Sequence, residues 1–195
     1  EIDILFGTQV LAKGFHFRKV TTVGIIDSDI AGTNIDLKAN ERCFQMINQV
    51  SGRAGREEFE GEVILQTYFP ENQIFNYIVN QDSKAFYENE ISRRDDGFLP
   101  PFSRIAGIII TGDDEILVQK DAKRLRDFFP KIDNIKILGP APATLSKLKG
   151  KYRYRIILIA NKKFNIQNYI KTVIKKFNFS KNIDFRTEID PISFY

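Results

Sequence analysis

Two adjacent prolines, in the sequence GFLPPFS at residues 97–103, constrain the fold of this chain more than any other feature. Neighbouring prolines stop a helix and hold the backbone extended, because each lacks a backbone N–H and disfavours helical geometry in the residue before it. With 195 residues, the chain is long enough for two small hydrophobic cores. The sequence therefore predicts a domain boundary here, with a second domain over residues 99–195.

Short apolar runs alternate with polar connections in residues 1–70. Three runs bounded by turn residues are DILFG (3–7), TTVGIID (21–27) and GEVILQTY (61–68), and they suit parallel strands covered on both faces. Residues 39–55, ANERCFQMINQVSGRAG, contain an early asparagine able to cap a helix and glycine near their end, which predicts a crossover helix. We expect an α/β layer in residues 1–70 and a helical linker over residues 71–98.

The segment after the prolines has a different order of expected elements. A strand and a helix precede two strands at residues 134–138 and 152–160, which are separated by an expected loop, GPAPATLSKLKGK, at residues 139–151. A further helix and a final strand complete the order βαββαβ. This order fits a ferredoxin-like α+β sandwich.

Composition and charge set limits on function. The single Cys43 cannot form an internal disulfide, and we expect it in the core. No apolar run is long enough to span a membrane. A reducing, cytoplasmic setting without membrane contact is the expectation. The net charge of +4 is compatible with a polyanionic partner but does not demonstrate one.

The segment QVSGRAGR at residues 49–56 places polar residues at helical spacing. If the helix continues through it, Gln49, Arg53 and Arg56 lie within about 60° of one another. Guanidinium groups match phosphate oxygens in bidentate geometry, which indicates a phosphate ligand. The alternative is a pair of exposed arginines near a helix C-terminus, where cations are favoured in any case.

A second basic segment, KLKGKYRYR, places Lys147, Lys149, Lys151, Arg153 and Arg155 among Tyr152 and Tyr154. Cations beside aromatic rings are typical of nucleic-acid binding, and odd-numbered residues of a strand here would share one face. The alternative is an edge strand protected by cations.

Several motifs together resemble one protein family. GTQVLAKGFHF (7–17) and QVSGRAGR (49–56) resemble motifs V and VI of superfamily 2 helicases. With LPPFSR (99–104) and GPAPATLSKLKGKYRYRIIL (139–158), the chain resembles the C-terminal part of the PriA (primosomal protein N′) family. This implies that residues 1–70 are the end of a second RecA-like helicase lobe and that the chain is the back part of something longer.

The resemblance also implies functional roles. The family is an ATP-dependent 3′–5′ DNA helicase, an ATP hydrolase, in primosome assembly and restart of stalled replication forks. Its motifs imply catalytic Arg53 and Arg56 and cofactor-binding Gln49, Lys13 and Gly14 at an ATP and Mg²⁺ site shared with an absent lobe. Zinc belongs to the full-length family, and its ligands are absent here. Because this chain alone lacks the Walker motifs that bind ATP and Mg²⁺, it is predicted to be inactive.

DNA and protein partners follow from the same resemblance. It implies contacts of Thr8, Gln9 and the basic segment, namely Lys147, Lys149, Lys151, Tyr152 and Arg153, with forked or single-stranded DNA. Single-strand-binding protein and primosome proteins are the implied protein partners.

Two other interpretations stay open at this point. One is a non-enzymatic nucleic-acid-binding remnant or split-gene product that lacks the ATP-binding lobe. The other is a different superfamily 2 helicase with an unrelated tail. No metal site is predicted in the chain, since acids such as Asp27 and Asp29 after a strand more often cap or pair locally.

Overall fold

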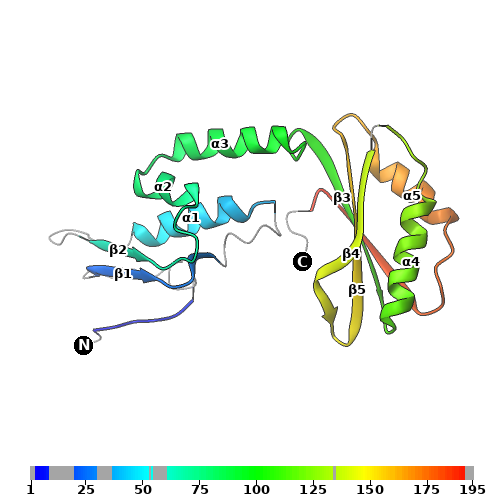
Figure 1. Cartoon of the computed structure of the whole chain (residues 1–195), viewed down its shortest axis with the longest axis horizontal. Helices are drawn as coiled ribbons and strands as arrows, with labels where there is room; N and C mark the ends of the chain where they lie inside the picture. Colours follow the sequence, from blue (N-terminus) through cyan, green and yellow to red (C-terminus); the bar gives the residue numbers. More distant parts are fainter. Residues whose placement is uncertain are drawn as a thin grey trace. The chain divides into compact units, whose positions relative to one another are not determined.

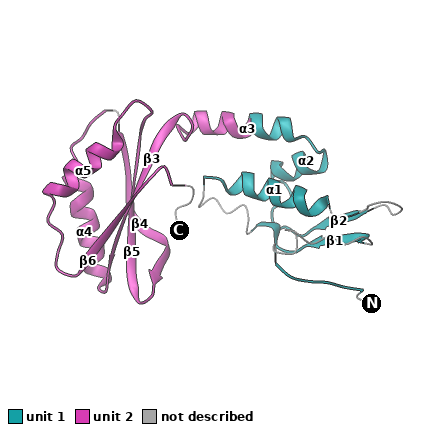
Figure 2. Ribbon diagram, turned by 180° about the vertical axis from the view of Figure 1, so that it is seen from behind, with its two compact units in different colours: residues 1–88 teal, residues 89–195 magenta. Residues whose placement is uncertain are grey.

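The computed structural model describes residues 3–8, 20–29, 37–52, 54, 61–133 and 135–191. The chain divides into two compact units, residues 1–88 and 89–195 (Figure 2). Each unit has a hydrophobic core of its own. The domain boundaries predicted at residues 70 and 98 stay predictions.

The first unit contains a parallel pair of strands joined through a helix. Strand β1 (Thr22–Ile25) pairs with β2 (Glu62–Leu65), and helix α1 (Ala39–Ser51) lies between them in the chain. Parallel neighbours cannot be joined by a tight turn and need such a crossover. The α/β character, the parallel pairing and the crossover helix agree with the sequence-based prediction.

The first predicted strand of this unit is wrong. Residues 3–7 are not in a strand, and Ile4 and Phe6 are 84% and 91% exposed. The described sheet has only β1 and β2, so the apolar run has no strand beside it. Both strands also alternate between exposed and half-buried residues, so they are not covered on both faces as predicted.

Two helices follow β2, as the sequence predicted. Helix α2 (Gln73–Val79) begins after Asn72, whose side chain accepts a hydrogen bond from the Ile74 amide, and α3 (Ser83–Asp96) follows. The Phe86 ring of α3 stacks on Phe44 of α1 with centroids 4.1 Å apart. The core of this unit therefore joins α1, α2 and the start of α3 through Cys43, Phe44, Ile47, Ile74, Phe75, Ile78 and Phe86.

The second unit contains a four-stranded antiparallel sheet and two helices (Figure 1). Its elements are β3 (Ser103–Gly112), α4 (Glu115–Phe128), β4 (Ile135–Leu148), β5 (Lys151–Asn161), α5 (Ile166–Lys176) and β6 (Ile183–Ile189). The strand order across the sheet is β4-β5-β3-β6. The chain order βαββαβ is the one that the sequence predicts.

Both α4 and α5 pack on the same face of this sheet (Figure 1). Even-numbered residues of β3 and β5, such as Ile108 and Ile156, are buried against Val118 of α4 and Ile170 of α5. Because side chains alternate along a strand, odd-numbered residues of β3 and β5 lie on the opposite face. We call this opposite face, away from α4 and α5, the open face.

The predicted loop at residues 139–151 is wrong for most of its length. Strand β4 continues to Leu148, and Lys149 and Gly150 form a two-residue hairpin turn with φ values of 51° and 82°. The prolines in this stretch are tolerated because β4 is an edge strand, where a missing N–H need not break the ladder. Irregular register on either side of Ala141 and Pro142 absorbs the extra residues.

Candidate nucleic-acid interface

Helix α1 positions the first residue of the predicted phosphate-binding set. Gln49 is exposed in its last turn, and the helix ends at Ser51 with Gly52 as its C-cap. The continuous helix assumed through Arg56 is therefore not formed. Arg53 and Arg56 lie outside the described residues, so their common face and their ATP contacts stay predictions.

The residues of the other predicted motif are mostly outside the described part of the chain as well. Gln9, Lys13 and Gly14 are not described, and Thr8 is exposed. Their predicted contacts with nucleotide and DNA stay predictions.

The ends of β1 and β2 are joined by local polar contacts. The Asp29 carboxylate accepts hydrogen bonds from the Thr67 hydroxyl at 2.5 Å and from the Tyr68 amide at 2.7 Å. Nearby Cys43 is buried, and its Sγ lies 3.8 Å from the Ser28 carbonyl oxygen. Burial, and secondarily the charge of Asp29, raise the pKa of this thiol to about 11. The core position expected for Cys43 is confirmed.

The β4–β5 hairpin carries the predicted nucleic-acid contacts, but its two faces differ. Lys147 is directly opposite Tyr152, and its ammonium lies 4.5 Å from the centre of that ring and 3.3 Å from its hydroxyl. A cation over an aromatic ring contributes about 0.5–1 kcal/mol at an exposed site. Tyr152 packs against the core shared with α4 and α5, so this pair lies on the helix side of the sheet.

Lys151 and Arg153 lie instead on the open face. The Lys151 ammonium pairs with Asp184 of β6 at 3.3 Å. Arg153 is only 6% exposed, and its Nη1 donates to the Leu145 carbonyl oxygen at 3.4 Å, which connects the two hairpin strands. The structure therefore divides the predicted residues between two faces, and Lys149 is exposed in the turn that joins them.

The structure adds Arg186 of β6 to the cations of the open face. Arg186 and Arg155 lie on either side of Ile109 in the β-ladder. Arg186 forms an ion pair with Glu188 at 2.7 Å, and its side chain is 59% exposed. The alternation of charged residues in the last strand was a signal that could have identified Arg186 from the sequence.

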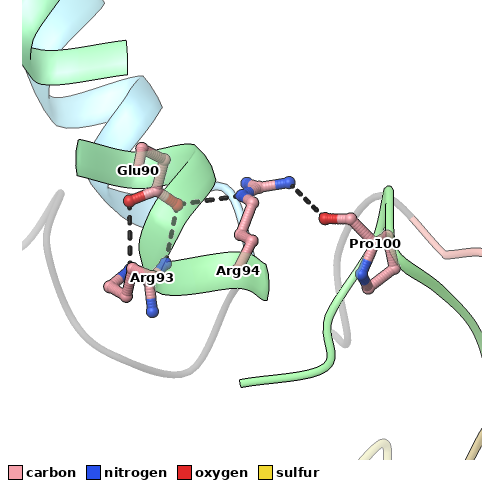
Figure 3. Close-up of polar contacts among 4 residues, drawn as sticks. All are labelled: Glu90, Arg93, Arg94 and Pro100. Carbon is pink, nitrogen blue, oxygen red and sulfur yellow. Dashed lines mark hydrogen bonds and ion pairs between the residues drawn. The ribbon is translucent and has the colours of Figure 1, made fainter. Parts of the chain in front are cut away.

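A buried ionic cluster at the end of α3 was also missed. Glu90 is 3% exposed and accepts hydrogen bonds from Arg93 at 3.1 and 2.6 Å and from Arg94 at 3.0 Å (Figure 3). Arg94 also donates to the Pro100 carbonyl oxygen at 3.0 Å, which fixes the proline segment to the helix. Burial alone raises the pKa of Glu90, but the two arginines outweigh it and hold that pKa below the ordinary value of 4.5. The spacing of an acid three and four residues before two arginines is the sequence signal.

No helix within the described ranges combines the length and the apolar content that crossing a bilayer requires.

Comparisons with known proteins cover both units of the chain. Residues 96–192 match the family model described as the primosomal protein N C-terminal domain. The whole chain is similar to replication restart protein PriA of Rickettsia conorii, with 47% identity over 195 residues, and spans 30% of that relative. The proteins of the same name from Haemophilus influenzae and Bacillus subtilis are 34% and 32% identical over 96% and 89% of this chain, which spans 26% and 21% of their lengths.

Proposed function

Because the chain belongs to the PriA family, we propose that it is the C-terminal portion of an ATP-dependent 3′–5′ DNA helicase acting in primosome assembly and restart of stalled replication forks. The observation that carries this proposal is the similarity to replication restart proteins over all 195 residues, so that it includes both compact units. A remnant that only binds nucleic acid is not favoured, since the similarity includes the first unit as well as the second.

The fold supports a different domain assignment for each of the two units. We assign the first to the end of a second RecA-like lobe, since a parallel pair joined by a crossover helix is the repeating unit of such sheets. We assign the second to a ferredoxin-like domain on the basis of its βαββαβ order and its antiparallel sheet.

The proposed ATP site is shared with a lobe outside this chain. Gln49, Arg53 and Arg56 would contact the γ-phosphate of Mg²⁺-bound ATP. At this position an arginine stabilises the negative charge of the transition state. Lys13 and Gly14 would help to hold the nucleotide. The chain has no G-x-x-x-x-G-K-[ST] loop, so we expect no ATP hydrolysis by the chain alone.

The DNA contacts are proposed for the hairpin. Lys147 and Lys149 are exposed near its turn, and Lys151 is half-exposed beside them, so all three can reach phosphate oxygens. Forked or single-stranded DNA, single-strand-binding protein and primosome proteins are the proposed partners, in the cytoplasm. The burial of Arg153 supports a structural contribution to the hairpin, with its charge acting at longer range.

The test uses a complete protein that carries this chain. We expect Arg56→Ala to lower DNA-stimulated ATP turnover by on the order of 10³, while the affinity for forked DNA stays nearly unchanged, because the lost charge acts on the transition state. Arg56→Lys should rescue little, since an ammonium lacks the planar fork. Lys171→Ala on α5 is the control and should change neither quantity.

Steady-state ATP turnover at saturating forked DNA is measured beside a DNA-binding titration. An Arg56→Ala variant that hydrolyses ATP normally but no longer binds DNA would show that this arginine faces nucleic acid and that the proposed ATP role is wrong.

A further inference from the structure

We propose that the open face of the four-stranded sheet binds the sugar-phosphate backbone of single-stranded DNA, with Arg155 and Arg186 as phosphate contacts. This inference rests on the proposed DNA-binding function and extends it from the hairpin turn to a second surface. The hairpin supplies one end of this surface, because Lys151 belongs both to the basic segment and to the open face.

The position of the two arginines follows from the strand register. Ile109 of β3 is directly opposite Arg155 of β5 on one side and Arg186 of β6 on the other. Adjacent strands are about 4.8 Å apart, so the two arginine backbones are separated by about 10 Å. Ile109 is 2% exposed although α4 and α5 lie on the other face of the sheet. Long arginine side chains can cover such a residue and still present their guanidinium groups to solvent.

The open face carries more positive than negative charge. Two carboxylates on its strands, Asp184 and Glu188, already pair with Lys151 and Arg186. The cations that the register places on this face are Lys136, Lys151, Arg153, Arg155 and Arg186. A surface with this excess attracts a polyanion.

Arg155 is the cation most affected by its surroundings. Burial and the neighbouring charge of Arg153 lower its pKa, while Glu188 opposes them. Arg153 is two residues away on the same strand face, so the two positive charges repel each other. An anion placed over Arg155 would reduce this repulsion.

The distribution of these groups favours a nucleic-acid strand over a compact acidic protein surface. Cations occur on three strands, from Lys136 on β4 through Arg155 on β5 to Arg186 on β6, so one extended polyanion can contact all of them. Leu138 and Leu148 are exposed on the same face and offer apolar contact to bases. Other four-stranded sheets also bind single-stranded nucleic acid on one face, where aromatic side chains stack on the bases.

The experiment measures binding of a fluorescein-labelled oligothymidylate to this 195-residue chain by fluorescence anisotropy at several salt concentrations. We expect Arg155→Gln with Arg186→Gln to weaken binding by on the order of tenfold and to reduce the slope of log affinity against log salt by about 1.4, because two phosphate contacts are lost. Lys171→Gln with Lys175→Gln on α5 removes the same charge and should change the affinity by less than twofold. Lys136→Gln with Arg186→Gln alters only exposed groups, so it replaces the first variant if that one is unstable. It should weaken binding to a similar extent.

The outcomes separate this inference from the function on which it rests. If the unmodified chain binds the oligonucleotide and the open-face variants bind equally well, the inference is wrong and the DNA-binding proposal stands. If the unmodified chain does not bind at all, both are wrong. Poly-glutamate could also bind as tightly as the oligonucleotide, and the same variants could abolish this binding. That result would assign the face to an acidic protein and would overturn the inference.

Discussion

Removal of Arg94 should destabilise the second unit strongly, because it takes a charged hydrogen-bond donor away from a buried carboxylate. Glu90 is almost completely buried, and Arg93, the other arginine that donates to it, has a side chain that is 46% exposed. The substitution Arg94→Met keeps much of the side-chain volume and removes the bonds to Glu90 and to the Pro100 carbonyl oxygen. It therefore tests the ionic contacts more than the packing.

The expected loss is about 3 kcal/mol of unfolding free energy. Breaking a buried ion pair from one side costs about 3–5 kcal/mol, and the two bonds from Arg93 favour the lower end. For a unit of roughly 100 residues, 1 kcal/mol corresponds to about 4–8 °C, so we expect its melting temperature to fall by at least about 12 °C. The double variant Glu90→Leu with Arg94→Met should recover most of this loss, because no buried charge is then left.

Two measurements check this prediction in the full chain. Urea unfolding followed by circular dichroism gives the free energy, and hydrogen exchange of the Leu99 amide, which donates to the Arg94 carbonyl oxygen at 2.8 Å, reports locally on the proline segment. Because the pKa of Glu90 is lowered by folding, its stabilisation is present above the ordinary value of 4.5 and is lost as pH falls below it. Arg94→Met should show a smaller acid-dependent loss. A loss under 1 kcal/mol with unchanged Leu99 exchange would refute the reasoning.

Two further predictions concern the thiol and the edge strand. Cys43, with a pKa of about 11, should react with a disulfide reagent at pH 8 at least 100-fold more slowly in the native chain than in urea. Burial and a low thiolate fraction both protect it in the native chain. Equal rates would contradict its burial. Gly139→Ala should cost at least about 2 kcal/mol in a thermal melt, because φ is 92° and a Cβ would lie 2.7 Å from the Arg155 carbonyl oxygen. The control Gly150→Ala, with φ of 82° and open space, should cost about 1 kcal/mol, and equal losses would show that the close contact is unimportant.

Local sequence patterns determined much of the second unit. Val118, Ala122 and Leu125 recur at helical spacing along α4, and these residues are fully buried in the core. Asp114 then caps the helix by accepting a hydrogen bond from the Leu117 amide at 3.1 Å. Such signals act over a few residues, and therefore the order of helices and strands could be read without a structure.

The candidate site was predicted only in part. The sequence identified Lys149 and Lys151 as cations of a basic segment, and the structure places this segment on the β4–β5 hairpin. It did not show that Arg153 would be buried or that Arg186, more than 30 residues later, would lie on the same face as Arg155. The register that aligns both arginines with Ile109 is a contact between distant segments.

Tertiary structure also decided where apolar and proline-rich segments became strands. The run at residues 3–7 has a strand-like composition but no neighbouring strand in the described sheet, whereas residues 139–148 contain two prolines and still pair with β5. Composition sets the propensity of a segment, but a strand exists only when a second segment supplies its hydrogen bonds. The sequence by itself determined the order of the elements after the prolines, while strand pairing decided which residues share a face.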